Sequence, residues 1–293
     1  MCIRDSNSAS FNVARIIGPS VAGFLIVAFG DNTGPVFLLN AASFAAVIFA
    51  LTRMHGDELH PTPILERGPG QLREGLLYVL ARRDLLCVLT IVFFAGTFGL
   101  NYQMTTALMA TEIYHKGAGE YGLLGSILAI GSLSGALLSA RRGAAHLRLI
   151  VLAGLAFGLL TMVAGLMPTY WIFAISLVPV GFAALTLITS ANATMQLGVE
   201  ATMRGRVMAL YMMMFMGGTA VGAPLIGLLA EMFGARWGLI GGGLITLVGT
   251  AVAALVLVRR EGMVLADVLS FRRTTSAPEQ IENHRISDVA QRS

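Results

Sequence analysis

The sequence predicts an all-helical integral membrane protein with eight transmembrane helices. Three observations predict this fold class. The chain of 293 residues is 56% hydrophobic and only 12% charged, whereas about a quarter of the residues of a soluble domain are charged. Its apolar runs have the roughly 20 residues that a helix needs to cross a bilayer, which is too long for barrel strands. Its arginines stand at the ends of these runs.

The apolar runs follow one another through most of the chain. Helices are expected because backbone polar groups within lipid must be satisfied inside the segment itself. The first two runs form a hairpin around the short turn GDNTG at 30–34, and the other six begin after a polar stretch. In order, the expected spans are 11–29, 35–52, 85–109, 121–140, 147–167, 171–191, 207–230 and 238–258.

The distribution of basic residues predicts the orientation of the chain. With both termini in the cytoplasm, the outer loops keep only Lys116 and Arg236, which agrees with the positive-inside rule. The net charge of +4 then needs no nucleic-acid partner. The arginines on the inner side are Arg53, Arg67, Arg73, Arg82, Arg83, Arg141, Arg142, Arg148, Arg204, Arg206, Arg259 and Arg260.

A polar stretch separates the first two spans (10–53) from the other six (85–258). Residues 54–84 are interpreted as a cytoplasmic linker, with prolines at 61, 63 and 69 in its first part. The segment QLREGLLYVLARRDLL at 71–86 predicts an amphipathic helix in the inner interface. A simple N-terminal extension of the next span fits the sequence equally well. The apolar residues at helical spacing are Leu72, Leu76, Val79 and Leu80.

The two ends of the chain carry no apolar span. Residues 1–9 have no apolar region of the kind that a signal peptide needs. The stretch MCIRDS fits no element, and one interpretation is that it is an artefact of the chosen reading frame. Residues 259–293 are polar and without clear periodicity, so we expect a disordered cytoplasmic tail.

One stretch of the sequence is nearly repeated. IIGPSVAGFLIVAFG at 16–30 aligns without a gap with AVGAPLIGLLAEMFG at 220–234. A repeat in a polytopic membrane protein indicates two pseudo-symmetric halves. The second copy lies in the last hairpin of the six-span bundle. The first copy would then belong to the last hairpin of another six-span bundle, and four spans would precede residue 1. Chance similarity between glycine-rich apolar segments is the alternative.

Three stretches resemble a known family. They are SASFNVARIIGPSVAGFLI at 8–26, LREGLLYVLARRDLL at 72–86, and the segment 195–236, which contains RGRVMALY. They are similar to parts of major facilitator superfamily transporters, and within these to the enterobactin exporter and related bacterial drug-efflux proteins. That superfamily has twelve spans in two six-helix bundles. The resemblance matches helices five to twelve, so it implies an N-terminally truncated chain with the last hairpin of one bundle and a complete C-terminal bundle.

The resemblance implies a secondary active transporter. Its substrates would be small amphiphilic molecules such as drugs or siderophores, exported by antiport across the bacterial inner membrane. The implied partners are the lipid bilayer, the small-molecule substrate and a coupling ion, expected to be the proton. The two bundles would rock about a central site. The alternative is a genuine eight-span membrane protein that acts as a sensor or assembly partner without transport.

The motif GPSVAG at 18–23 resembles the antiporter motif of the superfamily. Its expected functional residues are Gly18, Pro19 and Gly23. Proline removes a backbone donor and can bend the helix, while glycines allow a neighbouring helix to come close. Close packing without a role in coupling is an equally good interpretation. Arg15, Arg204 and Arg206 lie at inner ends of predicted spans and are expected to gate or to anchor the protein on the cytoplasmic side.

Polar residues inside membrane spans are the usual indication of a substrate path. Asn40, Asn101 and Gln103 are therefore candidate cavity-lining residues, and hydrogen bonding between helices is the alternative. Met212 and Met216 are candidates because flexible thioethers suit a surface that accepts varied apolar ligands. Filling of the core is the simpler role for them. No acidic residue falls at the middle of a predicted span.

The sequence lacks the patterns of enzymes and of metal or cofactor proteins. The five histidines are scattered along the chain, and neither Cys2 nor Cys87 stands at a ligand spacing. There is no glycine-rich phosphate-binding loop before a lysine. Catalysis, a metal, a cofactor and an ATP-driven pump are therefore not expected.

The orientation can be tested with reporter fusions. A green fluorescent protein fused after Ser293 should fluoresce, because the predicted tail stays in the cytoplasm, where this reporter folds; the same reporter does not fluoresce when it is exported unfolded across the membrane. An alkaline phosphatase fused after Lys116 should be active, because the enzyme needs the outer compartment. The opposite pattern of the two reporters would show that the arginine-rich loops lie outside.

Overall fold

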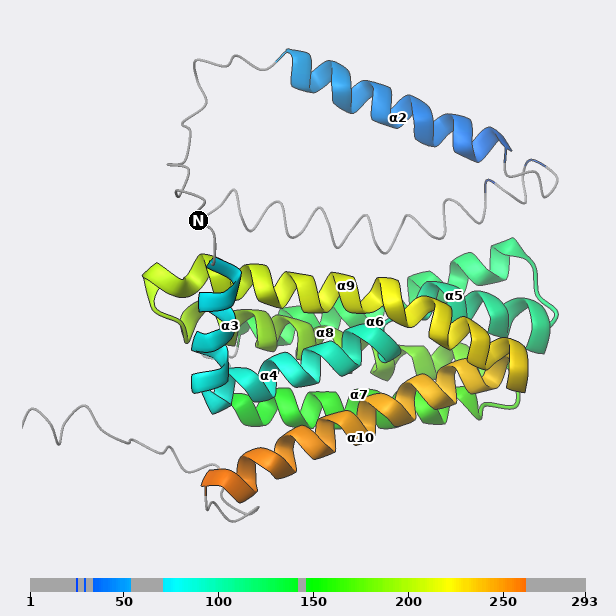
Figure 1. Cartoon of the computed structure of the whole chain (residues 1–293). Helices are drawn as coiled ribbons and strands as arrows, with labels where there is room; N and C mark the ends of the chain where they lie inside the picture. The colour runs from blue at the N-terminus through cyan, green and yellow to red at the C-terminus, as the bar shows by residue number, and fades with distance from the viewer. Residues whose placement is uncertain (1–24, 26–28, 30–33, 54–70, 142–145, 262–293) are drawn as a thin grey trace, which may run out of the picture. The chain divides into compact units, whose positions relative to one another are not determined.

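The computed structural model describes residues 25, 29, 34–53, 71–141 and 146–261. All regular structure in these residues is helical (Figure 1). The elements are α2 (Gly34–Thr52), α3 (Gln71–Ala81), α4 (Arg83–Phe94), the π-helical η2 (Ala95–Gly99), α5 (Tyr102–Leu108), the π-helical η3 (Met109–Ile113), α6 (Ala118–Arg141), α7 (Leu147–Gly165), α8 (Tyr170–Leu197), α9 (Ala201–Phe233) and α10 (Ala235–Glu261).

Seven helical stretches in this part of the chain are long and apolar enough to cross a membrane. They correspond to the second to eighth predicted spans, so the all-helical membrane fold is confirmed. The first predicted span, 11–29, lies outside the described residues except for residues 25 and 29. The helices extend beyond the predicted apolar cores. Helix α9 begins at Ala201 and not near residue 207, because helical hydrogen bonding continues through the polar residues at its start.

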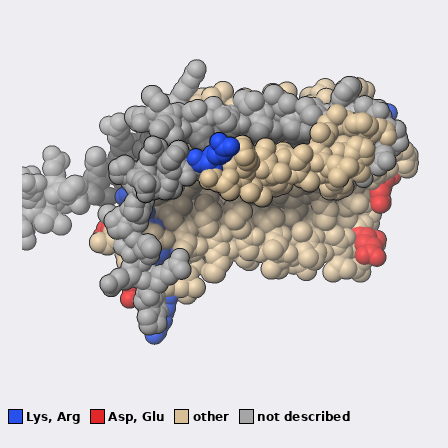
Figure 2. All heavy atoms as spheres, turned by 90° about the horizontal axis from the view of Figure 1, so that it is seen from above, with Lys and Arg blue, Asp and Glu red and all other residues tan. Residues whose placement is uncertain are grey.

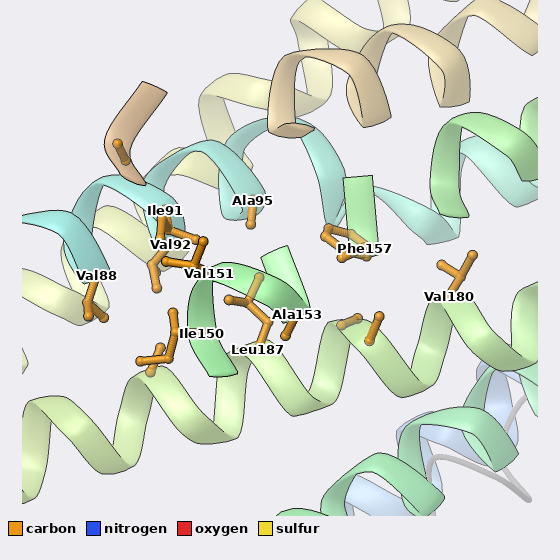
Figure 3. Packing of buried hydrophobic residues seen from close by; sticks show 14 of the residues in the cluster. Val88, Ile91, Val92, Ala95, Ile150, Val151, Ala153, Phe157, Val180 and Leu187 are labelled. Carbon is orange, nitrogen blue, oxygen red and sulfur yellow. The ribbon is translucent and has the colours of Figure 1, made fainter. Parts of the chain in front are cut away.

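Part of the buried core lies between α4, α7 and α8 (Figure 3). Val88 and Ile91 of α4 face Ile150 of α7 in this cluster, and Leu187 of α8 closes it. These side chains are branched or aromatic, so they fill the space between the helices tightly. Phe157 of α7 is fully buried, and the cluster continues past it to Val180 of α8.

Glycines set the distance between α6 and α8. A Cβ atom added at Gly131 would collide with the backbone carbonyl of Val178, and one at Gly135 would lie 2.6 Å from the Phe182 carbonyl oxygen. Gly181 of α8 lies in the same way against α6. Gly131 and Gly135 therefore form a helix-contact face, because small residues four positions apart lie on the same side of a membrane helix.

A second close contact joins α7 and α10. A Cβ atom at Gly158 of α7 would lie 2.8 Å from the carbonyl oxygen of Gly243 in α10, and one at Gly243 would lie 2.7 Å from the carbonyl oxygen of Gly158. The two backbones touch because neither residue has a side chain. Lipid tails are as apolar as the helix surfaces, so the hydrophobic effect does not drive helices together within a bilayer. Close van der Waals contacts such as this one therefore stabilise the bundle.

The loops at one end of the bundle are held by side chains that bind backbone carbonyls. Nη1 of Arg236 donates to the carbonyl oxygens of Gly165 and Met167, at 3.2 and 2.9 Å. The hydroxyl of Tyr114 also donates to the Met167 carbonyl oxygen, at 2.9 Å. Burial raises the pKa of the Tyr114 hydroxyl, against an opposing effect of Arg236, so the group stays a donor. Arg236 thus satisfies carbonyls that the end of α7 leaves unpaired.

Charged and aromatic residues gather at the ends of the helices. Figure 2 shows most of the blue atoms towards one end, red atoms at both ends with the larger groups at the opposite end, and a mostly uncharged surface between them. Trp171 and Trp237 lie in the first turns of α8 and α10, at the same end as Arg236. Tryptophan prefers the membrane–water interface, so these residues mark one boundary of the membrane-embedded belt.

Glycine contacts can be tested on α9, which has two glycines in different surroundings. A Cβ at Gly222 would collide with the backbone carbonyl of Thr97, whereas nothing lies within 4 Å of one at Gly217. We expect Gly222→Ala to lower the free energy of unfolding by roughly 1–3 kcal/mol through overpacking. Gly217→Ala should leave it unchanged or raise it by up to about 1 kcal/mol through helix propensity. Reversible unfolding in mixed micelles measures both, and equal stability of the two variants would contradict the contact.

Candidate functional site

The third predicted span is interrupted in its middle. Helix α4 changes into the π-helical η2 at Ala95, Leu100 and Asn101 are not helical, and α5 begins at Tyr102. A second π-helical turn, η3, ends the span. Turns of π-helix occur often at functional sites. Non-helical backbone at membrane depth is tolerated only where protein buries it or where it lines a cavity. We therefore take this interruption as the candidate site.

The local sequence AGTFGLN at 95–101 explains where the helix breaks. Gly96 and Gly99 lower the helix propensity, and an asparagine side chain competes for backbone hydrogen bonds. Nδ2 of Asn101 donates to the Thr97 carbonyl oxygen at 2.8 Å. The backbone N–H of Leu100 donates to the Ala95 carbonyl oxygen at 2.9 Å. The interruption is thus stabilised by the Asn101 side chain and by a backbone hydrogen bond that reaches five residues back, one more than in an α-helix.

Hydroxyl groups from two other helices also bind backbone carbonyls at the interruption. The Thr219 hydroxyl of α9 lies 3.2 Å from the Gly96 carbonyl oxygen and 3.0 Å from the Phe215 carbonyl oxygen of its own helix, so its one proton is shared between the two. Thr246 of α10 lies 3.4 Å from the Phe94 carbonyl oxygen and donates to its own helix at Gly242, at 2.8 Å. The site is therefore built from neutral oxygen atoms contributed by η2, α9 and α10.

The hydroxyl of Thr97 has no hydrogen-bond partner among the described residues, although the residue is only 2% exposed. A Cβ atom at Gly218 of α9 would lie 2.5 Å from this hydroxyl, so the group faces the glycine. Thr161, Thr186 and Thr250 also have buried hydroxyls without a hydrogen-bond partner among the described residues. Thr97 differs from them because it lies in the interrupted segment. The sequence analysis missed Thr97, although two glycines and an asparagine around it within an apolar run were a signal.

The structure places the predicted polar residues in different surroundings. Asn101 is buried and its amide group binds a carbonyl of its own segment, which differs from the bond between helices considered above. The side chain of Gln103 is exposed, and its backbone carbonyl accepts the hydroxyl of Tyr121 at 3.2 Å. Asn40 is exposed on α2, none of whose residues is buried. Their role as cavity-lining residues stays a prediction.

Three methionines form an exposed face in the N-terminal half of α9. Met212, Met213 and Met216 are 44%, 47% and 67% exposed, and we call them the methionine face. Tyr211, in contrast, is buried and stacks on Phe215. The opposite side of the same helix contacts η2 through Gly218 and Gly222. The methionines therefore do not fill the core of the described bundle.

The predicted cytoplasmic arginines differ in their contacts. Nη1 of Arg206 lies 2.6 Å from Oε2 of Glu74 in α3, which is an ion pair between two helices. Arg204 is exposed and donates to the Val199 carbonyl oxygen at 3.5 Å. Four predicted residues lie outside the described part of the chain: Arg15, Gly18, Pro19 and Gly23.

Carboxylates are confined to helix ends in the described bundle. Asp84 and Glu120 lie in the first turns of α4 and α6, Glu112 lies in η3, and Glu231 lies near the end of α9. No group of three or more histidine, cysteine, aspartate or glutamate residues suited to a metal ion occurs among the described residues. The chemistry of the site is therefore that of neutral hydroxyl, amide and carbonyl groups.

Comparison with known proteins gives one family. A family model described as transmembrane secretion effector matches residues 5–281. No curated protein matches the chain. The matched region includes the interrupted span, the methionine face and the residues of the GPSVAG motif.

Asn101 offers a test of the interruption. In Asn101→Ala the Thr97 carbonyl loses its side-chain donor, which should weaken the local structure by about 1 kcal/mol. Backbone amides of 95–108 should then exchange hydrogen for deuterium several-fold faster in detergent micelles. Gln103→Ala, which removes an exposed amide group from the same segment, is the matched control and should exchange like the unchanged protein. Equal exchange in both variants would show that the Asn101 bond does not stabilise the break.

Proposed function

Because the chain belongs to the transmembrane secretion effector family of the major facilitator superfamily, we propose that it exports small amphiphilic molecules. Membership makes it a multi-pass transporter that is embedded in a lipid bilayer and acts on a small-molecule substrate. The direction of transport, the class of substrate and the coupling are our proposals. The proposed location is the bacterial inner membrane, with both termini in the cytoplasm, on the basis of the arginine distribution.

The methionine face is the observation on which the substrate class rests. Its three side chains are exposed although they belong to an apolar membrane helix with a well-packed opposite side. Methionine is unbranched and polarizable, so it adapts to apolar ligands of different shapes. We propose that Met212 and Met216 line the central cavity between the two bundles. An amphiphilic substrate would place its apolar part against them.

The interrupted span supplies a polar counterpart at membrane depth. The unpartnered hydroxyl of Thr97 and the carbonyls of η2 are uncharged, so they suit a polar group that forms hydrogen bonds better than a strong ion. In transporters, discontinuous helices often provide the polar part of the binding site. We propose that this segment, with Asn101 and Gln103 beside it, receives the polar end of the substrate.

The repeat supports a packing role for the GPSVAG motif. Gly222, which aligns with Gly18, lies against the backbone of Thr97. We propose that Gly18, Pro19 and Gly23 form a comparable close contact and that transport is antiport with protons. A proton-coupled carboxylate within lipid is costly and needs a protected place. In the described helices the carboxylates lie at the ends, so we propose that the coupling group lies outside these helices.

The proposal predicts the effect of mutations on efflux. In cells that carry the natural gene, deletion should raise the accumulation of an uncharged amphiphilic dye, and a protonophore should abolish the difference. The double variant Met212→Ala with Met216→Ala should slow dye efflux several-fold, because the substrate loses apolar contacts. Initial rates of efflux from preloaded cells measure the effect.

Met232→Ala is the matched control. Met232 is an exposed methionine of the same helix, but it lies one residue from the end of α9. Its substitution should leave the efflux rate unchanged while expression stays equal in all variants. If deletion of the gene does not alter accumulation of any amphiphilic dye, the export proposal fails. If Met232→Ala slows efflux as much as the double variant of Met212 and Met216 does, the assignment of these two residues to the cavity fails.

A further inference from the structure

Helix α3 has an apolar face that no described residue covers. Leu72, Leu76, Leu77 and Leu80 are each between 39% and 54% exposed. With 3.6 residues per turn, these four side chains fall on one continuous arc of the helix. Gly75 and Val79 lie on the neighbouring arc and are buried. A short helix thus presents one side to the bundle and a separate leucine arc (Leu72, Leu76, Leu77 and Leu80) away from it.

The inner side of α3 is fixed to the start of α9. A Cβ atom at Gly75 would lie 3.2 Å from Cβ of Arg206, so the backbones are close. Glu74 forms its ion pair with the same arginine, with 2.6 Å between Oε2 and Nη1. Helix α3 ends at Ala81, and the extended backbone of Arg82 turns the chain into α4. The segment 71–81 is therefore a helix of its own and not an extension of the span.

The charge around the leucine arc is positive. Both carboxylates in 71–84 are bound by arginines: Glu74 by Arg206 and Asp84 by Arg82. The hydrogen bond to Asp84 raises the pKa of Arg82, so that pair stays charged. Arg73 is exposed, and its position on the helix falls within the arc of the leucines. An arginine among leucines can extend its guanidinium towards water or phosphate while its stem stays in an apolar layer.

The position of α3 relative to the spans places this arc at the membrane surface. Helix α3 runs across the ends of α4 and α9 and not along them (Figure 1). The spans of α4 and α9 cross the bilayer, so a helix across their ends lies along its surface. Helices with leucines on one face and basic residues beside them bind at the boundary of headgroups and acyl chains, more strongly where anionic lipids are present.

We propose that α3 binds anionic phospholipid of the adjacent leaflet, with the leucine arc against the acyl chains and Arg73 at the lipid phosphate. The bound helix holds the start of α9 in place through Gly75 and the Glu74–Arg206 ion pair. This surface is separate from the substrate site at the interrupted span. The inference does not depend on which molecule is transported or in which direction.

Hydrogen exchange of the full chain in lipid nanodiscs tests the proposal. Backbone amides of 71–81 should exchange several-fold more slowly in discs of phosphatidylcholine mixed with phosphatidylglycerol than in phosphatidylcholine alone. Arg73→Gln should remove most of this difference, because the phosphate loses its partner. Leu76→Ser with Leu80→Ser should speed exchange in both kinds of disc, because the apolar contact is lost. Soluble glycerol phosphate added to phosphatidylcholine discs should have no effect.

Lys116→Gln is the control for charge alone, since it removes one exposed positive charge outside α3. It should keep the full response to phosphatidylglycerol. Exchange in α6 and α8 reports whether each variant remains folded. Equal protection of 71–81 in both lipids would overturn the proposal. So would an unchanged lipid response in Arg73→Gln, or protection by soluble glycerol phosphate, which would indicate a phosphate site without a membrane contact.

Discussion

The close contact of α9 with η2 is the constraint on which the rest of the structure depends. Gly218 and Gly222 bring the backbone of α9 against Thr97, where any side chain would collide. Within lipid, apolar helices gain little from mutual burial, and their association rests on contact between surfaces that fit closely. The glycines permit that contact, and they also decide which side of α9 faces inwards. The methionine face, on the other side, is left exposed as a consequence.

The interruption of the span follows from the same contact. A broken helix exposes carbonyl groups that a bilayer cannot satisfy. Thr219 can reach the Gly96 carbonyl only because α9 lies so close, and Thr246 approaches the Phe94 carbonyl because Gly242 of α10 comes close to Phe98. The neutral polar character of the candidate site is thus a product of helix packing. The Thr97 hydroxyl at this contact is one of several buried hydroxyl groups that lack a hydrogen-bond partner among the described residues.

The two ends of the bundle are held by different interactions. At one end, Arg236 and Tyr114 donate to carbonyl groups that follow α7. At the other, arginines are paired with carboxylates, as in Glu74 with Arg206. Hydrogen bonds to fixed carbonyls hold a rigid geometry, whereas the partly exposed Glu74–Arg206 ion pair is screened by salt and acts together with the backbone contact at Gly75. Charged lipid headgroups can therefore affect the ion pairs at the end with α3 more than the hydrogen bonds at the other end.

The sequence by itself determined the fold class, because hydrophobicity and span length follow directly from what a bilayer demands of a chain. Seven of the eight predicted spans lie in the described residues as helices. The orientation and the sites of Asn40, Gln103, Met212 and Met216 stay predictions.

Other features were decided only by tertiary structure. Periodicity could not show that the third span breaks at Leu100 and Asn101, because the run stays apolar on both sides and the break is stabilised by Thr219 and Thr246 from distant parts of the chain. It could not show that Glu74 pairs with Arg206, since that bond joins helices far apart in sequence. Composition determines that a segment enters the membrane. Contacts between segments decide where its helix is interrupted and which of its faces remains exposed.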